Sequence, residues 1–312
     1  MAANPLNKLL RPRLPSAAAG IETDAAAVVQ LDRSRSGFVV RRAASVRLAE
    51  GLIEPSFENQ NISDPTELAR ALAELATGAG LLKQRKWSVC LPEASTRAAI
   101  LTIEGPTTSR RELEEVFQWK VERSFGAPVS ALRLAREQLP QDAKRQTRFL
   151  VNALHRDVLA GYEAVLDALG WHVGLILPRH AGESQWLRNG HQGDSLLLTA
   201  HDEGFTAVLL RGGSLLALRS VFCEAAECDD ELHRFLLFYR DRASSGVESP
   251  QIDRLLVIGD QLDKRRVAEI ANEALGVRLK PMSAADVGLV VPAGEMDFDA
   301  IAAPAGLARM AW

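Results

Sequence analysis

Two stretches of the sequence predict the fold, because each contains short strands joined by tight turns. Residues 19–48 read AGIETDAAAVVQLDRSRSGFVVRRAASVRL, and residues 195–221 read SLLLTAHDEGFTAVLLRGGSLLALRSV. Each stretch contains three apolar runs separated by short segments rich in Asp, Ser or Gly, which is typical of strands joined by tight turns. The expected strands are 19–23, 26–31 and 38–48 in the first stretch, and 195–200, 205–210 and 214–221 in the second.

A helix and a further strand follow each stretch. After the first, Asp64 can cap a helix that has Pro65 at its first position, and a strand is expected at 87–91. After the second, we expect a helix over 229–242 and a strand over 254–258. The order strand-strand-strand-helix-strand therefore occurs twice. Hairpins followed by a helical crossover predict a mixed sheet in each half of the chain.

An α+β segment interrupts the first copy. Its central helix is opened by Thr108 or Ser109 and presents Leu113, Phe117 and Val121 on one apolar face. The other expected elements are strands at 98–103, 131–139, 148–154 and 171–177 and a helix at 157–169. Near the C-terminus, residues 298–310 favour a helix that Pro304 interrupts.

Composition excludes several classes of protein. The chain has 312 residues and a formal net charge of −3, so it carries no basic field for nucleic acid. Only 5% of the residues are aromatic, which argues against binding by base stacking. No run approaches the ~20 apolar residues that a membrane-spanning helix needs. The N-terminus also lacks the apolar core of a signal peptide.

Chemical motifs are equally scarce. Cys90, Cys223 and Cys228 form no CxxC pair, and their odd number argues against a disulfide framework or a zinc site. A reducing cytoplasm fits this usage. No GxSxG, HExxH, Walker or Rossmann motif occurs, so we expect no catalytic residue and no metal site.

The order of these pieces resembles the PilM family of type IV pilus assembly proteins, relatives of the division protein FtsA. The resemblance covers nearly the whole chain, and each piece is short. The matching segments are 10–13 (LRPR), 20–22 (GIE), 28–31 (VVQL), 91–92 (LP), 112–122 (ELEEVFQWKVE), 126–129 (GAPV), 229–240 (DDELHRFLLFYR), 252–257 (IDRLLV) and 301–308 (IAAPAGLA).

The resemblance implies an α/β fold of the actin-like, ribonuclease H-like type: two duplicated lobes with an inserted α+β subdomain. The family has an upper subdomain where Val221 here runs almost directly into Asp229, so the second lobe is expected to be reduced. The expected parts are a basic N-terminal tail at 1–16, a first lobe at 17–86, the inserted subdomain with the return to the first lobe at 87–180, and the second lobe at 181–312.

The family's nucleotide motifs are degenerate in this chain. An actin-like ATPase holds phosphates in two hairpin turns of Asp-x-Gly type, whose glycine lets backbone N–H groups approach the ligand. Glu22 and Asp24 stand in the first turn, and Thr199 and His201 replace the aspartate and glycine of the second. The candidate residues of this degenerate cleft are Glu22, Asp24, Asp202, Gly204, Gly259 and Asp260. The alternative is that they are ordinary turn residues, and that His201 is a hairpin histidine without a catalytic role.

The resemblance implies a non-catalytic scaffold. The family lies at the cytoplasmic face of the inner membrane and binds the cytoplasmic tail of a PilN-like protein between the first lobe and the inserted subdomain. We therefore expect a cytoplasmic, peripheral adaptor with a PilN-like tail and other platform proteins as partners, no nucleic acid, and no cofactor.

Two alternatives remain open. The first is an ATPase whose ATP/ADP state, with magnesium, switches assembly if the cleft is retained. The second is the cytoplasmic component of a type II secretion platform, which the end of the chain at Trp312 without a membrane helix disfavours. Phe117 and Trp119 are the candidate partner-binding residues, because aromatic side chains are enriched at interfaces. The alternative for Trp119 is packing against the neighbouring lobe.

Overall fold

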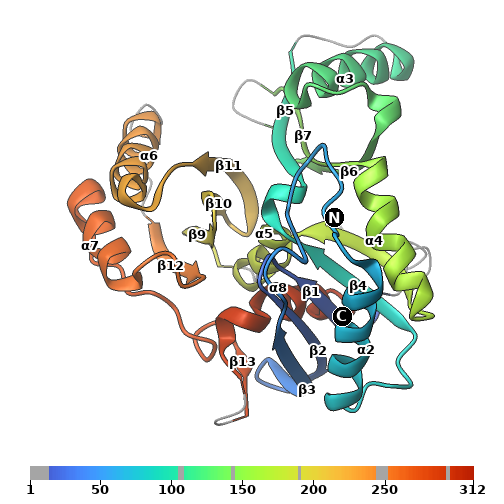
Figure 1. Ribbon diagram of the computed structural model, residues 1–312. Coiled ribbons are helices and arrows are strands. Elements are labelled where there is room, and N and C mark those ends of the chain that lie inside the picture. Colours follow the sequence, from blue (N-terminus) through green and yellow to red (C-terminus); the bar gives the residue numbers. More distant parts are fainter. Residues whose placement is uncertain (1–13, 105–108, 142–144, 189–190, 244–251, 293–295) are drawn as a thin grey trace.

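The computed structural model describes residues 14–104, 109–141, 145–188, 191–243, 252–292 and 296–312. Most of the predicted basic tail, residues 1–13, lies outside the described residues. Three sheets form the framework: one for each lobe and one for the inserted subdomain (Figure 1).

The first lobe is built on a six-stranded sheet with the order β13-β3-β2-β1-β4-β8. Its strands are β1 (Ala17–Ile21), β2 (Ala25–Arg33), β3 (Phe38–Arg47), β4 (Lys86–Leu91), β8 (His172–Pro178) and β13 (Leu289–Val290). Helices α2 (Pro65–Gly78) and α4 (Arg156–Ala168) cover one face, and α8 (Phe298–Arg309) covers the other. Alternate residues of β1 serve the two faces, since Ala17 and Ala19 pack beneath α2 while Ala18 packs beneath α8.

The second lobe repeats the central order with fewer strands. Its sheet is β11-β10-β9-β12, formed by β9 (Asp194–His201), β10 (Gly204–Arg211), β11 (Ser214–Phe222) and β12 (Ile252–Ile258). Helices α6 (Cys228–Ala243) and α7 (Lys264–Leu275) pack on one face. Because β11 ends at Phe222 and α6 begins at Cys228, no upper subdomain stands between them, as expected for a reduced lobe.

The inserted subdomain has its own core. Its sheet has the order β5-β7-β6, from β5 (Arg97–Ile103), β7 (Thr147–His155) and β6 (Leu132–Leu139), and α3 (Arg110–Phe125) covers it. Phe117, Val121 and Phe125 of α3 pack against Phe149 and its neighbours. Phe117 is only 3% exposed. The prediction that Phe117 binds a partner is therefore corrected, because the apolar face of an amphipathic helix is the face that is buried.

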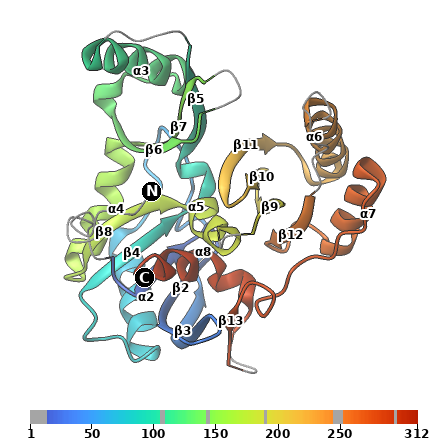
Figure 2. The ribbon, with the colours of Figure 1, turned by 180° about the vertical axis from the view of Figure 1, so that it is seen from behind.

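A segment that the periodicity did not predict joins the two lobes. It comprises α5 (Arg179–Glu183) and the 3₁₀ turn η3 (Ser184–Leu187), and it crosses α8 between the sheets (Figure 2). The backbones meet at two glycines: an added Cβ on Gly182 would lie 2.3 Å from the Ala303 carbonyl oxygen, and one on Gly306 would lie 1.9 Å from that of Gly182. Only glycine permits this approach.

Pro304 lies inside α8 and does not interrupt the helix, which corrects that expectation. Proline in a helix interior removes one backbone hydrogen bond, at a cost of about 3 kcal/mol. Here residues 301–308 are all buried, and Pro304 lies directly beneath Gly20 of β1. The burial of this helix between the sheet and α5 outweighs the local cost.

Candidate functional site

A cavity of about 440 Å³ lies between the two lobes and is called here the interlobe cleft. The hairpin turns β1–β2 and β9–β10 face each other across it, with the end of β12 and the start of α8 between them. Five of the six predicted cleft residues line it: Glu22, Asp24, Asp202, Gly259 and Asp260. The duplicated hairpins thus bring together Glu22 and Asp202, which are 180 positions apart in sequence.

Gly204 is the exception. It is a buried turn residue with φ of +134°, and an added Cβ would lie 2.2 Å from the carbonyl oxygen of Val221. Glycine is required at this position because the backbone of β11 approaches it closely. Glu203, the residue before it, is the one that lines the cleft.

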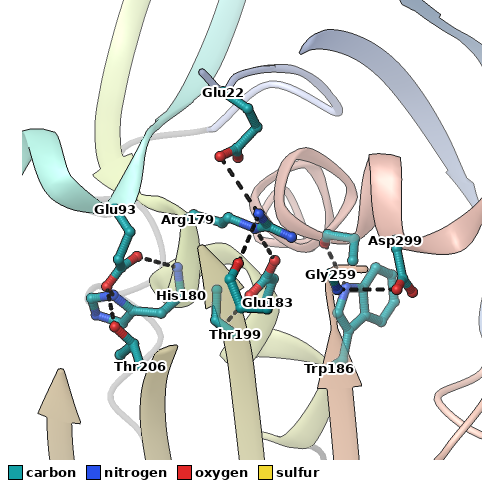
Figure 3. A network of polar contacts seen from close by, with 12 residues as sticks. Glu22, Glu93, Arg179, His180, Glu183, Trp186, Thr199, Thr206, Gly259 and Asp299 are labelled. Atoms are coloured by element: carbon teal, nitrogen blue, oxygen red, sulfur yellow. Dashed lines mark hydrogen bonds and ion pairs between the residues drawn. The ribbon is translucent and has the colours of Figure 1, made fainter. Parts of the chain in front are cut away.

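Arg179 occupies the floor of the cleft. Its Nε donates to Glu183 Oε1 at 2.6 Å, its Nη1 donates to the carbonyl of Ala200 at 3.3 Å, and its Nη1 lies 3.5 Å from Glu22 Oε2 (Figure 3). The Thr199 hydroxyl donates to the other oxygen of Glu183. These residues, Glu22, Arg179, Glu183 and Thr199, form the Arg179 cluster, which joins the connector α5 to strands of both lobes.

A second polar group lies beside the cluster. Glu93, in the 3₁₀ turn η1 (Glu93–Ser95), accepts from His180 Nδ1 at 2.5 Å and from the His180 backbone N–H at 3.2 Å. The Thr206 hydroxyl of β10 donates at 3.0 Å to Glu93 Oε1, the oxygen that also accepts from His180 Nδ1. Glu93, His180 and Thr206 form the interlobe bridge, a buried link between the first lobe, the connector and the second lobe.

Burial and charge set the protonation of these groups. Burial raises the pKa of Glu22 to about 7, against the opposing charge of Arg179, and burial also raises the pKa of Glu183. For Glu93, burial alone would raise the pKa, but the charge and hydrogen bonds of His180 outweigh it and lower the pKa to about 2. Burial acts to lower the pKa of Arg179, but the carboxylates of Glu183 and Glu22 dominate and raise it, so the guanidinium stays charged.

A carboxylate lies at the part of the cleft that Gly259 lines. Asp299, in the first turn of α8, accepts from the Gly259 backbone N–H at 3.0 Å and from Lys264 Nζ at 2.8 Å. Asp202 accepts from the side-chain amide of Gln261 at 3.2 Å. The backbone donor and the ammonium that could approach a phosphate here are thus already engaged by Asp299.

These residues do not fit a magnesium-bound nucleotide well. A polyphosphate in the cleft would face Glu22, Asp24, Asp202, Glu203 and Asp260 at close range, and like charges repel strongly in a partly buried site. The cluster's one guanidinium is shared by two carboxylates. Within the described ranges, no three His, Cys, Asp or Glu side chains are grouped so as to hold a metal ion.

A second cavity, of about 270 Å³, lies between the inserted subdomain and the lobes and is called the subdomain groove. β6 and β7 form one wall, α5 and η3 the floor, and β10 and β11 the far wall. Three buried polar atoms of its lining residues have no hydrogen-bond partner among the described residues: Asn152 Oδ1, His180 Nε2 and Arg188 Nε.

The remaining candidates lie apart from this pair of cavities or at their edge. Trp119 is 55% exposed on α3 and lies beneath the guanidinium of Arg123, so it does not pack against a neighbouring lobe. His201 lines the interlobe cleft, and neither ring nitrogen has a partner within the described chain. Cys90 is buried, while the Cys223 and Cys228 sulfurs lie 3.0 Å apart as free thiols.

Sequence reasoning missed the residues that dominate the site. Arg179, His180 and Glu183 all belong to α5, which at five residues is too short to show helical periodicity. One signal was available: Arg179 and Glu183 are four residues apart, the spacing of an ion pair on a helix. Glu93 follows the end of β4, between the strands expected at 87–91 and 98–103.

Comparison with known proteins shows the fold class. No family model matches the chain, and no curated protein sequence matches it. A solved chain of the "PilM-PilN type IV pilus biogenesis complex" is similar over 96% of this chain and 99% of that one, with 20% identity and a TM-score of 0.74. The cytoplasmic domain of EpsL from Vibrio cholerae (14% identity, 87% and 91% covered, TM-score 0.48) and EutJ from Carboxydothermus hydrogenoformans (11%, 97% and 93%, 0.46) are more distant.

The chain therefore has the actin-like ATPase fold, as the duplicated order of strands predicted. Within that class it is PilM-like in its fold, including the inserted subdomain. No helix in the described part of the chain is both long and apolar enough to cross a membrane.

Proposed function

We propose that this chain is a non-catalytic, actin-like scaffold of a type IV pilus or related secretion platform. It works at the cytoplasmic face of the inner membrane, where it binds the cytoplasmic tail of a PilN-like membrane protein. The observation that carries the proposal is the PilM-like fold over 96% of the chain, combined with a cleft whose charges disfavour a nucleotide.

The state of the interlobe cleft supports a non-catalytic role. An actin-like ATPase holds its phosphates in two hairpin turns, one from each lobe. Here Arg179 bonds to Glu183 of the connector and to the Ala200 carbonyl of the second lobe, and it pairs with Glu22 of the first. The protein's own side chains thus supply the contacts between the lobes, and closure needs no ligand.

The subdomain groove supports binding of an extended tail. The groove lies along the sheet face that carries Ala135 and Glu137 of β6 and their paired residues Asn152 and Leu150 of β7, which suits a peptide in an extended conformation. Leu150, Val208 and Leu218 supply apolar contacts in the groove, and His180, Asn152 and Arg188 supply polar ones. This mixture suits a short peptide with alternating apolar and polar side chains.

The direct test is calorimetry with a synthetic peptide that carries the cytoplasmic tail of the PilN-like protein from the same genome. Binding to the wild-type protein without nucleotide is expected. Ala135→Arg places a long side chain in the groove at an exposed position and is expected to abolish binding. Ala164→Arg, at an exposed position on α4, is the matched control and is expected to bind normally. Equal binding by both variants would move the tail site elsewhere, and no binding by wild type would refute the proposal.

A nucleotide-responsive ATPase is the second candidate. The size of the interlobe cleft favours it, because about 440 Å³ lies within the usual range of small-molecule sites. It requires Glu22, Asp24 and Asp202 to bind magnesium with the phosphates. Magnesium-dependent nucleotide binding to wild type, lost in Asp24→Asn, would establish this candidate in place of the first.

A further inference from the structure

His180 lies between the subdomain groove and the interlobe cleft. It is 2% exposed, and its ring has two different surroundings. Nδ1 lies 2.5 Å from Glu93 Oε1, and Glu93 lines the interlobe cleft. Nε2 is buried without a partner among the described residues, and His180 is one of the residues that line the subdomain groove. One imidazole therefore stands between the two cavities.

The link continues into the second lobe through a single carboxylate oxygen. Glu93 Oε1 accepts both from His180 Nδ1 and, at 3.0 Å, from the Thr206 hydroxyl (Figure 3). The Ser220 hydroxyl lies 3.0 Å from the Thr206 oxygen and extends the chain to β11. All three members of the interlobe bridge are buried, so water does not compete for these bonds.

The charge of Glu93 defines what Nε2 can do. Burial would raise the pKa of this carboxyl, but the neighbouring His180 lowers it to about 2, so Glu93 is ionised near neutral pH and accepts a hydrogen bond from Nδ1–H. Nε2 is then the ring nitrogen that has no partner among the described residues, on a residue that lines the groove. A hydrogen bond that Nε2 accepts polarises the ring and strengthens the bond that Nδ1–H donates to Glu93, because linked hydrogen bonds reinforce one another at low dielectric.

We infer that His180 couples occupation of the subdomain groove to closure of the lobes. A hydrogen-bond donor of the bound tail donates to His180 Nε2, which strengthens the contacts of Glu93 with His180 and Thr206 and holds the second lobe against the first. The identity of the occupant, a PilN-like tail, rests on the proposed function. By reciprocity, the factor by which the bound tail strengthens the bridge equals the factor by which the bridge strengthens tail binding. A variant that weakens the bridge at Thr206 is therefore expected to bind the tail more weakly.

Thr206→Val tests this coupling at a distance. Thr206 is not among the lining residues of the groove, and valine keeps its shape while removing the hydroxyl. The same tail peptide is expected to bind this variant about fivefold more weakly, since one hydrogen bond to a charged group is lost. In wild type the peptide is expected to slow hydrogen exchange of the β10 amides. Thr77→Val, on the exposed side of α2, is the control and is expected to match wild type.

His180→Asn separates the two sides of the ring. Asparagine can still donate to Glu93 from the position of Nδ1, but it has no atom at the position of Nε2. We expect β10 exchange in the free variant to match wild type, and the slowing caused by the peptide to disappear. A circular-dichroism melt of each variant checks that the fold is retained.

The outcomes are distinct. Wild-type affinity in Thr206→Val, or peptide-dependent slowing of β10 exchange in His180→Asn, would overturn the coupling and leave the proposed function intact. Absence of tail binding by wild type would overturn both. Weaker binding by Thr206→Val together with loss of the exchange effect in His180→Asn would establish the coupling.

Discussion

Arg179 is the residue on which the interlobe contacts depend. Its side chain is 11% exposed and neutralises Glu183, which is completely buried. Removing one member of a buried ion pair typically costs 3–5 kcal/mol, because the remaining charge loses its partner. The carboxylates would then have to be protonated or hydrated, and the second lobe would lose its hydrogen bond at Ala200.

Arg179→Met is therefore expected to lower the free energy of unfolding by about 3 kcal/mol at neutral pH. Arg70→Met, which removes an exposed pair with Glu74, is the control and is expected to cost under about 1 kcal/mol. Urea unfolding followed by circular dichroism gives both values. Equal, small losses in the two variants would show that the Arg179 cluster does not hold the lobes.

Glu22 is expected to give the protein a characteristic pH dependence. Its pKa is raised by burial from 4.5 to about 7, so the folded chain holds this proton more tightly than the unfolded chain does. The contribution of Glu22 to the free energy of unfolding is therefore fully present below about pH 4.5 and is lost as the pH rises through 7. Its side chain is still 28% exposed, so the loss is expected to be about 2 kcal/mol.

The difference in unfolding free energy between wild type and Glu22→Gln isolates the contribution of Glu22, because the other groups titrate in both proteins. We expect the unfolding free energy of wild type, relative to the variant, to fall between pH 4.5 and 8. A difference that stays constant, or that grows in favour of wild type as the pH rises, would mean that the ion pair with Arg179 outweighs burial.

At the scale of elements, the crossing of α5 and α8 positions the site. Their backbones touch at Gly182 and Gly306, and the Trp186 indole N–H donates to the Ala302 carbonyl at 2.8 Å. α5 carries Arg179, His180 and Glu183 on one side of this contact. A change in the distance between the helices would move all three side chains relative to both cavities.

Gly182→Ala is expected to destabilise the protein by at least about 2 kcal/mol, since its Cβ would overlap the Ala303 carbonyl. Gly161→Ala is the matched control: it lies inside α4 with nothing within 4 Å, so alanine is expected to stabilise by about 0.5–1 kcal/mol. Thermal unfolding of the two variants should shift in opposite directions. A neutral Gly182→Ala would show that the crossing can relax.

The sequence allowed the regular elements to be predicted far better than the site. α2 and α3 begin directly after Asp64 and Ser109, whose side chains cap them as expected, and α3 ends at a glycine in the left-handed conformation. The hairpin turns were located for the same reason, because turn chemistry is local. α5 has only one local signal, the four-residue spacing of Arg179 and Glu183, because its position is fixed by contacts with α8 and with β9 of the second lobe.

This difference explains the outcome for the candidate residues. Glu22, Asp24, Asp202, Gly259 and Asp260 converge on one cleft, because the duplicated topology brings the hairpins together. The sequence could not show that Arg179 and Asp299 engage the groups around them, because those contacts depend on packing between elements distant in sequence. Phe117 was misjudged for a simpler reason: its place on the apolar face of α3 already favoured burial.

At the scale of the whole molecule, the two lobes and the inserted subdomain are joined by their own side chains. The Arg179 cluster and the interlobe bridge connect the lobes, and Arg148 of β7 donates to the Leu216 carbonyl at 2.9 Å, which links the subdomain to the second lobe. The lobes of this PilM-like fold are thus linked by internal bonds around the interlobe cleft.

The most direct test of this account is a calorimetric titration of ATP with magnesium into the purified wild-type protein. The account predicts no saturable heat up to about 1 mM nucleotide, a limit that corresponds to about −4 kcal/mol of binding free energy. Micromolar binding that requires magnesium would contradict it. That result would mean that Glu22, Asp24 and Asp202 rearrange around a metal, and that the chain is a nucleotide-dependent switch.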